Sequence, residues 1–364
     1  MQFEKSERIV SLDVFRGLTI AAMILVNNPG SWSNVYGPLR HADWHGLNLA
    51  DLVFPLFLFI VGVSVALSFG RRLEVGERKR QLYVKILRRS LILFSLGLFL
   101  NAFPEFDIAT LRIPGVLQRI SVCYLATAVI FLNTHWKAQL VWAAGLLLVY
   151  WAAMEFIPLP GGAAGLYEKG NNLTNWIDGR LLAGHMWAQS KTWDPEGILS
   201  TIPAVSTALS GVQAGKWLRS GGTPMEKMRG MLAAGAAAVA AGSLWSILMP
   251  INKSLWTGSY CVLTAGLASI CLGIIYYLVD VRGWKRWAQP ALVFGRNAIA
   301  VYVLAGVTAR LLYVIKVPGG GGTAITLKSW IYWNLFTSWL EGPNASLAFS
   351  LAFIAVMYIC MLPL

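Results

Sequence analysis

The sequence predicts an all-α, polytopic integral membrane protein with about eleven transmembrane helices. Of its 364 residues, 56% are hydrophobic and 13% are charged, whereas a soluble domain carries about 25% charged residues. The mean hydropathy is +0.58, and the apolar residues gather into runs of about 20, the length that crosses a bilayer as a helix. A chain of this kind buries its surface in lipid. We expect one transmembrane domain over residues 1–364.

The apolar runs place the helices in order along the chain. We expect spans near 9–27, 47–69, 84–103, 115–133, 138–157, 198–217, 229–249, 255–279, 289–315, 324–340 and 345–364. The tenth contains Lys328, Asn334 and Glu341, and could instead lie in the membrane interface. The long soluble segment is expected near 158–196. The start of the chain has no signal-peptide pattern, so we expect the first span to direct insertion.

The basic residues set the orientation, because cytoplasmic loops are enriched in Lys and Arg. Alternating the gaps between spans assigns eighteen Lys/Arg to one side and eight to the other. The richer side includes Lys5, Arg8 and the 71–89 and 216–229 segments. This predicts a cytoplasmic N-terminus and places residues 28–46 outside.

The net charge of +13 is consistent with this arrangement. The basic residues bracket apolar runs instead of forming one patch, which favours anionic lipid headgroups and argues against nucleic acid. The four cysteines lie in or beside apolar runs and show no CxxC zinc spacing, so neither a disulfide framework nor a metal site is expected.

Charged residues inside the spans indicate function or pairing, since isolated charges in lipid are costly. Asp13 and Arg16 lie three apart on one helix face and can form an ion pair. Arg119, in "RIPGVLQRI", and Arg296, followed by Asn297 in "FGRNAIAVYV", could each hold an anionic group or a structural partner.

Polar residues crowd the start of the second span in "RHADWHGLNLADLVFPLFLFIVG", residues 40–62. His41 and His45 are four apart, a spacing that can hold a metal, but the HExxH glutamate is absent. A histidine beside Asp43 or Asp51 would be oriented as a general base. Asp51 also suits the positive end of the helix dipole, and an interfacial histidine is the alternative reading of His41.

The chain resembles the transmembrane acyltransferases related to heparan-alpha-glucosaminide N-acetyltransferase, and looks most like the bacterial members. The resemblance rests on an ordered series of motifs: "SLDVFRGLTIAAMILVNNPG", "HADWHGLNLADLVFPLFLFIVGVS", "RIPGVLQRI", "DPEGILSTIPAVSTALSGVQAG", "INKSLWTGSYCVLTAGLA" and "GRNAIAVYV". It implies His41 as the catalytic histidine, Asn27 as the asparagine ending the first helix and Asp51 as the aspartate at the membrane entrance. His45 departs from the lysosomal relative, which has asparagine there.

The resemblance also implies the reaction. An acetyl or other acyl group would pass from cytoplasmic acyl-CoA to an amino sugar such as glucosamine on the other side of a bacterial inner membrane. We expect the anionic donor to contact basic and polar residues at the cytoplasmic side and along the bundle, namely Arg16, Arg88, Arg89, Arg119, Arg296 and Asn297. His41 could act as a general base or carry the acyl group itself. Asn27 would donate to the thioester oxygen, or simply cap its helix.

The acceptor would be held at the outer side. Trp176 and Asp178 in the 158–196 segment combine an aromatic face with a polar tip, as sugar sites do, although an aromatic belt at the membrane interface would look similar. Asp43, Trp44 and His45 beside His41 are the other candidate contacts.

Two rival functions remain open from the sequence. Intramembrane charges and Gly/Pro breaks also suit an amino-sugar transporter, although no inverted repeat is apparent. Acyl transfer to a lipid or a cell-wall polymer is the second. A homodimer is expected only because homodimers are the commonest oligomers.

Overall fold

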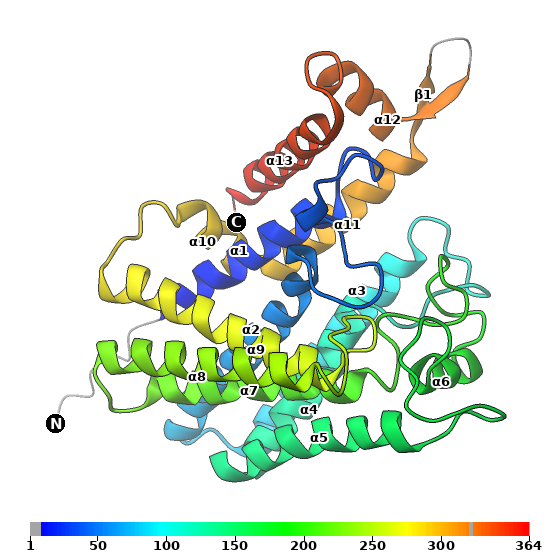
Figure 1. Cartoon of the computed structure of the whole chain (residues 1–364). Coiled ribbons are helices and arrows are strands. Elements are labelled where there is room, and N and C mark those ends of the chain that lie inside the picture. The colour runs from blue at the N-terminus through cyan, green and yellow to red at the C-terminus, as the bar shows by residue number, and fades with distance from the viewer. Residues whose placement is uncertain (1–8, 320–322, 364) are drawn as a thin grey trace.

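The protein is a bundle of helices that pack side by side, with a small C-terminal hairpin at one end (Figure 1). The computed structural model describes residues 9–319 and 323–363. Lys5 and Arg8, which contributed to the predicted orientation, lie outside the described residues. The α-helices are α1 (Val10–Asn27), α2 (Leu49–Glu74), α3 (Lys79–Ala102), α4 (Val116–Asn133), α5 (Trp136–Phe156), α6 (Leu173–Leu181), α7 (Thr201–Arg219), α8 (Pro224–Trp245), α9 (Gly258–Tyr276), α10 (Gln289–Arg296), α11 (Ala298–Val314), α12 (Leu327–Ile331) and α13 (Gly342–Met361).

Short elements join these helices. A 3-10 turn covers Gly37–Leu39, and π-helical turns follow α9 at Tyr277–Val281 and α12 at Tyr332–Phe336. Strands β1 (Lys316–Pro318) and β2 (Ala324–Thr326) form an antiparallel pair in which Lys316 faces Thr326.

Six of the described helices are long and apolar enough to cross a membrane, which confirms a multi-pass membrane protein. They are α1, α2, α4, α5, α9 with its π-helical turn, and α13. A seventh results if α10 and α11 count as one broken span. Helices α3, α7 and α8 contain 24, 19 and 22 residues and pack among them. The number of eleven spans stays a prediction.

Two of the predicted spans differ from the structure. The ninth, 289–315, is broken, because α10 and α11 meet at 87° where Asn297 ends the first helix. The tenth, 324–340, contains β2, the five-residue α12 and a five-residue π-helical turn. Ten helical residues rise about 15 Å, half the thickness of the hydrocarbon core. The tenth segment is therefore no straight span.

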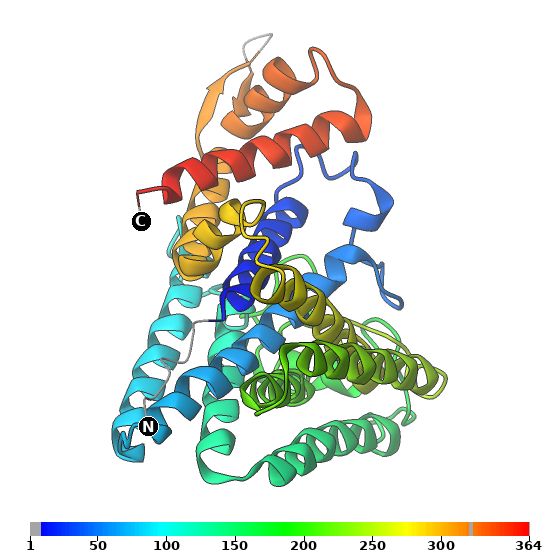
Figure 2. The ribbon, with the colours of Figure 1, turned by 90° about the vertical axis from the view of Figure 1, so that its left-hand side faces the viewer.

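Helix α1 lies at the centre and packs against α2, α9, α10, α11 and α13 (Figures 1 and 2). Its first turn would leave backbone N–H groups without partners. Asp280, in the π-helical turn after α9, is the partner of two of these groups. Its carboxylate accepts from the N–H groups of Val10 at 3.1 Å and Ser11 at 3.0 Å. A charge at the positive end of α1 thus ties α9 to α1.

Helices α2 and α7 approach each other closely through glycines. A Cβ atom added at Gly62 would lie 1.7 Å from the carbonyl oxygen of Ala208, and one at Gly211 would lie 2.0 Å from that of Phe59. Only residues without a side chain permit this backbone contact, which is a recurrent way of packing helices in membranes. The contact fixes α2 against α7, and α2 carries much of the site described below.

We predict that Gly62→Ala lowers the apparent melting temperature of the detergent-solubilised protein, because α2 and α7 must move apart. Gly145→Ala is the matched control, since a Cβ there meets nothing within 4 Å in α5. The control should be neutral or stabilising, by about 0.4–1 kcal/mol. Equal melting temperatures for the two variants would contradict this packing.

Candidate active site

The carboxylate of Asp51 organises the N-terminal end of α2. Asp51 is only 1% exposed and occupies the third position of the helix. Its Oδ2 accepts from the N–H groups of Asn48 and Ala42, both at 3.0 Å. The first contact belongs to a capping box, in which Asn48 and Asp51 satisfy each other's backbone donors.

The other oxygen of the carboxylate holds His41. Asp51 Oδ1 lies 2.7 Å from Nδ1 of His41. An ionised carboxylate only accepts hydrogen bonds, so in the neutral imidazole Nδ1 donates and Nε2 keeps its lone pair. The imidazole side chain is 42% exposed. This arrangement gives an oriented base or nucleophile that is open to a reactant.

Pro55 leaves the backbone carbonyl of Asp51 without its usual helical donor, because proline has no N–H. The hydroxyl of Tyr260 in α9 fills this position and donates to that carbonyl at 2.6 Å. Helix α9 is thereby attached to the first turn of α2 and fixes the height of Asp51 in the bundle.

Lys253 completes the group around His41, and the sequence analysis did not single it out. It lies between α8 and α9, with Nζ 3.1 Å and 3.3 Å from Nδ1 and Nε2 of His41 and 3.6 Å from Oδ1 of Asp51. Its side chain is 21% exposed. Burial lowers the pKa of Lys253, while Asp51 and Glu196 oppose that shift. The only sequence signal was its place in the quoted motif "INKSLWTGSY".

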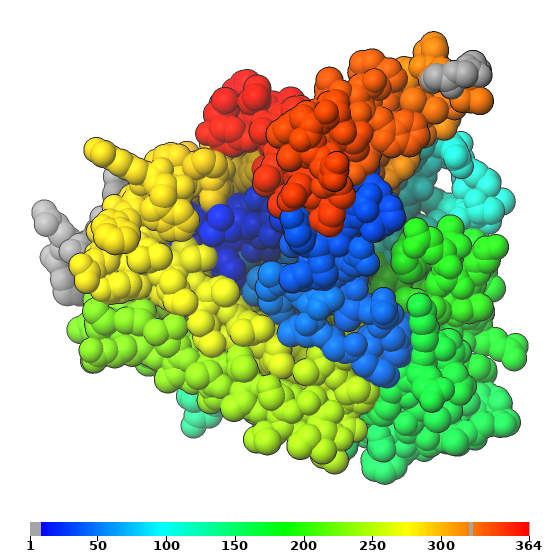
Figure 3. Space-filling model, turned by 45° about the horizontal axis from the view of Figure 1, so that its top comes forward, coloured from blue at the N-terminus to red at the C-terminus, as the bar shows by residue number. Residues whose placement is uncertain are grey.

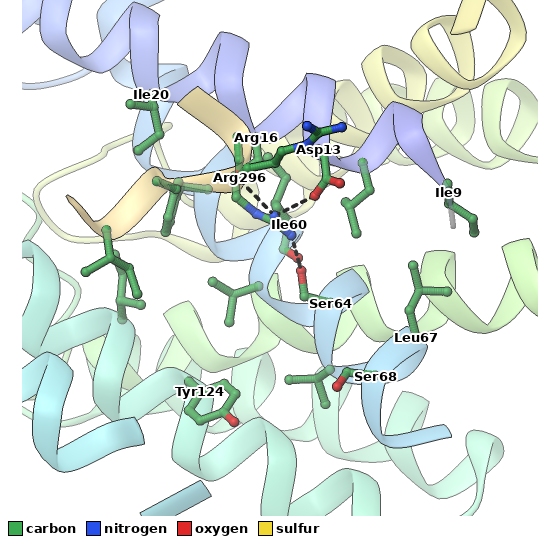
Figure 4. Close-up of a pocket in the computed structure, with 18 of the residues that line it drawn as sticks. Ile9, Asp13, Arg16, Ile20, Ile60, Ser64, Leu67, Ser68, Tyr124 and Arg296 are labelled. Atoms are coloured by element: carbon green, nitrogen blue, oxygen red, sulfur yellow. Dashed lines mark hydrogen bonds and ion pairs between the residues drawn. The ribbon is translucent and has the colours of Figure 1, made fainter. Parts of the chain in front are cut away.

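A large cavity of about 1950 Å³ lies between the helices, and Figure 4 shows part of its lining. It exceeds the roughly 300–1,000 Å³ of ordinary small-molecule sites. Along α2 its lining runs from Phe54 to Glu74, a rise of about 30 Å, close to the thickness of a hydrocarbon core. Phe54 is one helical turn from Asp51. The cavity therefore reaches from one end of α2 nearly to the His41–Asp51 pair.

The lining changes character along this length. Phe54, Phe57, Leu93 and Leu117 belong to its apolar part. The basic lining residues are Arg16, Arg71, Arg72, Lys85, Arg89, Arg219, Lys227, Lys285 and Arg296. With the exception of Arg16 and Arg296, they come from the segments that the sequence assigned to the cytoplasmic side.

Arg16 lies inside the cavity and is held by several groups (Figure 4). It donates to Asp13 at 2.9 Å, to Ser64 at 2.9 Å and to the carbonyl of Gly295 at 3.1 Å. The predicted Asp13–Arg16 ion pair is confirmed. Arg296 also lines the cavity, and Asn297 lines it at the bend between α10 and α11.

Two predicted donor contacts lie elsewhere. Arg88 is exposed and is not among the described residues that line the cavity. Its neighbour Arg89 does line the cavity. Arg119 is 2% exposed and also lies outside that lining. It donates to the carbonyl of Gly197 at 3.1 Å and to the Ser200 hydroxyl, and stacks 5.1 Å from the ring centroid of Trp256. The structure therefore gives Arg119 a structural position.

A second pocket of about 220 Å³ adjoins the cavity near the C-terminal end of α1. The two share Met23, Val116, Leu117 and Tyr302 as lining residues. Asn27, the last residue of α1, lines this pocket. The alternative role as a helix cap belongs to its neighbour Asn28, whose side chain donates to the carbonyl of Ile24 at 2.9 Å.

The predicted acceptor residues divide into exposed and packed ones. Asp43 and His45 are exposed near His41. Figure 3 shows the blue part of the chain at the surface, between the orange C-terminal part and the green segment. The indole of Trp44 donates to the carbonyl of Tyr167 at 2.7 Å and packs on Trp193. Trp44 therefore anchors the segment of residues 158–196.

Trp176 and Asp178, both on α6, do not share one exposed surface. Trp176 is 39% exposed, with the Arg180 guanidinium 5.6 Å from its ring centroid. Asp178 is fully buried, and its Oδ1 accepts from the Ile198 N–H at 2.9 Å. A carboxylate so enclosed makes no direct contact with a sugar in this conformation.

An ion-pair cluster that the sequence did not reveal holds the segment of residues 158–196 in place. Arg112 binds Asp194 with two hydrogen bonds, of 2.8 Å and 2.6 Å, and also pairs with Glu196. Asp194 accepts in addition from the backbone N–H groups of Trp187 and Glu196, both at 2.9 Å. Bidentate pairs of this kind fix geometry strongly. They join the loop before α4 to the loop before α7.

The fold and the site together define a class of protein: a multi-pass membrane protein with an oriented histidine at one end and a basic cavity at the other. The sequence profile described as heparan-alpha-glucosaminide N-acetyltransferase, catalytic, matches residues 8–248. The chain belongs to this family.

Two relatives show the extent of the similarity. Heparan-alpha-glucosaminide N-acetyltransferase of Mus musculus is 33% identical, over 82% of this chain and 53% of its own length. The Homo sapiens protein of the same name is 33% identical, over 81% of this chain and 52% of its own. The chain thus spans about half the length of these curated relatives.

We predict that Asp178→Asn stabilises the protein more at about pH 7.5 than at about pH 4. Burial raises the pKa of Asp178 from 3.8 to about 6. The folded state then binds the proton more tightly than the unfolded chain, so the free energy of unfolding falls as the pH rises through this interval and stays low above it. The asparagine lacks this penalty, and thermal unfolding at the two pH values measures it.

The matched control is Asp43→Asn, at an exposed position. It should shift the melting temperature little at either pH. A larger gain for Asp178→Asn in acid than at neutral pH would contradict the buried, raised-pKa carboxyl.

Proposed function

We propose that this protein is a membrane N-acetyltransferase that moves an acetyl group from acetyl-CoA to an amino sugar, such as glucosamine, on the opposite side of the membrane. The observation that carries the proposal is the 30 Å basic-to-apolar cavity that ends one turn from the His41–Asp51 pair. Family membership supports the same reaction.

The cavity suits the donor in each of its parts. Acetyl-CoA has an anionic nucleotide end and a long, uncharged arm that ends in the thioester. The basic lining, including Arg71, Arg89 and Arg219, offers charge to the phosphates. The apolar lining toward Phe54 and Leu117 suits the arm. A donor bound this way brings its thioester toward the outer end of α2.

His41 then acts as the general base. The sugar amine attacks the thioester carbonyl carbon, the carbonyl π pair moves to oxygen, and the amine proton passes to Nε2 of His41. When the carbonyl re-forms, the C–S bond breaks and His41 returns the proton to the thiolate sulfur. Asp51 stabilises the imidazolium through Nδ1. Asn27, at the junction of α1 and the outer pocket, is the proposed amide donor to the oxygen.

An acetyl-histidine intermediate is the second form of this mechanism. The exposed imidazole, with Nε2 turned away from Asp51, suits a nucleophile as well as a base. We further propose that the protein lies in a bacterial inner membrane, with the basic cavity open to the cytoplasm and His41 facing out.

His41→Ala is predicted to abolish acetyl transfer, with a loss of at least about 10²–10⁴-fold, while acetyl-CoA still binds. The assay incubates purified protein with labelled acetyl-CoA and glucosamine and measures acetylated sugar. The matched control is His45→Ala, which removes an exposed imidazole four residues away and should cost much less. Near-normal turnover of both variants would make the histidines interfacial anchors.

The same assay tests the transporter alternative. In sealed vesicles, a transporter would carry unmodified glucosamine across the membrane without consuming acetyl-CoA. That result in the wild-type protein would overturn the proposed function.

Charge reversal at Arg89 should weaken acetyl-CoA binding by at least about tenfold, the effect of roughly 1.4 kcal/mol. Arg89 lines the cavity and lies 5.2 Å from the ring centroid of Tyr124, whereas Arg88 does not line it. Arg88→Glu on the same helix is therefore the control and should weaken binding less. Titration calorimetry with acetyl-CoA compares them, and equal affinities would remove Arg89 from the donor site.

The orientation predicts opposite labelling of two cysteines. Gly37→Cys precedes His41 and has open space around its Cβ, and Val75→Cys lies in the basic loop after α2 and is 75% exposed. In a background without the native cysteines, an impermeant maleimide should label Gly37→Cys only from outside and Val75→Cys only from inside. The reverse pattern would overturn the orientation.

A further inference from the structure

We propose that Lys253 is a further catalytic residue, whose ammonium group stabilises the negative charge that develops on the thioester oxygen. This inference rests on the proposed acetyl transfer. It concerns a residue between α8 and α9 whose ammonium group lies beside the imidazole of His41.

The position of the ammonium group is the first observation. Lys253 Nζ lies 3.1 Å from Nδ1 and 3.3 Å from Nε2 of His41. The near-equal distances place Nζ away from the lone-pair direction of either nitrogen. The reacting atoms must gather around Nε2, so an oxygen there lies within reach of Nζ and its three donors.

Pairing with Asp51 does not account for this position. The Asp51 carboxylate already has His41 and the N–H groups of Ala42 and Asn48 as partners. Nζ is 3.6 Å from Oδ1, beyond the usual 2.7–2.9 Å of a charge-assisted hydrogen bond. The carboxylate is therefore satisfied without the lysine.

The electrostatics point the same way. A cation beside an imidazole opposes protonation of that imidazole, and partial burial of the cation adds a desolvation cost. A negative charge formed in the transition state between the two groups would reverse that balance. Preorganised charges aimed at such an oxygen are commonly the largest single contribution to catalysis.

The loop that carries Lys253 is fixed in place. The side chain of the buried Asn252 accepts from the N–H of Leu255 at 2.9 Å, and its backbone N–H donates to the Thr257 hydroxyl at 3.1 Å. The carbonyl of Ile251 accepts from the N–H of Gly46 at 2.9 Å, which joins this loop to the His41 segment. The lysine is thus positioned by backbone contacts that exist before substrate binds.

Lys253 forms no covalent bond in this scheme. While the amine nitrogen bonds to the carbonyl carbon, the π pair rests on oxygen and accepts hydrogen bonds from Nζ. When the pair returns and the C–S bond breaks, the oxygen becomes neutral and the ammonium is released unchanged. His41 carries the only proton that moves.

The test compares Lys253→Met, Lys253→Gln and Lys253→Arg with Lys316→Met, a control at an exposed lysine in β1. We expect Lys253→Met to lower kcat by about 10²–10³-fold, the usual effect of one lost oxyanion donor. Acetyl-CoA affinity, measured by calorimetry, and the melting temperature should stay near wild type. Lys253→Arg, which keeps the charge, and Lys253→Gln, which keeps a donor, should lose less. Lys316→Met should match wild type.

The outcomes separate this inference from the proposed function. Inactive His41→Ala with fully active Lys253→Met would overturn the role of Lys253 and leave the acetyltransferase intact. A wild-type protein that acetylates no amino sugar would overturn both. If all three Lys253 variants lose activity equally, together with thermal stability or donor affinity, Lys253 is structural and the inference fails.

Discussion

The carboxylate of Asp51 is the interaction on which the site depends. One oxygen closes the capping box of α2 and binds the Ala42 N–H, and the other binds the imidazole of His41. The helix start and the reactive side chain are therefore set by a single buried charge. The backbone carbonyl of the same residue binds Tyr260 because Pro55 cannot supply the helical donor. A residue that fixes a helix end, a neighbouring helix and a histidine at once leaves little freedom in the position of that histidine.

The rest of the bundle preserves this geometry over the length of α2. The close contact through Gly62 and Gly211 holds α2 against α7, and Asp280 holds α1 to the end of α9. Between these helices the cavity extends for most of the membrane thickness. Its lining is basic at one end and apolar toward Phe54, so one helix connects a region that attracts anions to a region that holds an imidazole.

Much of this arrangement could be predicted from the sequence, because apolar runs of about twenty residues determine helices in a membrane. The pairing of Asp13 with Arg16 followed from their spacing, as did the place of Asp51 in the first turn of α2. The bend at Asn297 could not be predicted, because residues 289–315 are apolar on both sides of it. The predicted span at 324–340 was wrong because apolar composition alone does not distinguish a long helix from a short helix and a π-helical turn.

The candidate site was less predictable for a physical reason: it is assembled from distant segments. Lys253 meets His41 across more than two hundred residues, so no local pattern marks their contact. Arg119 and Asp178 have charged side chains of the kind that bind ligands, yet both are buried. Their burial is set by tertiary packing, which the sequence does not show. Arg88 and Arg89 are adjacent in sequence, but only Arg89 turns toward the cavity. Local spacing predicts which residues share a helix face. The packing of the helices determines whether that face contacts a cavity, another helix or the surroundings of the protein.

The basic end of the cavity is the proposed entrance of the donor, and this has a consequence for the order of release. Under the proposed reaction, the spent CoA leaves by the path through which the acetylated donor arrived, while the acetylated sugar leaves from the His41 side. Free CoA would then compete with acetyl-CoA for one entrance and would never occupy the entrance of the sugar. At a given concentration of sugar on one side of the membrane, the turnover of the protein would follow the ratio of acetylated to free CoA on the other side.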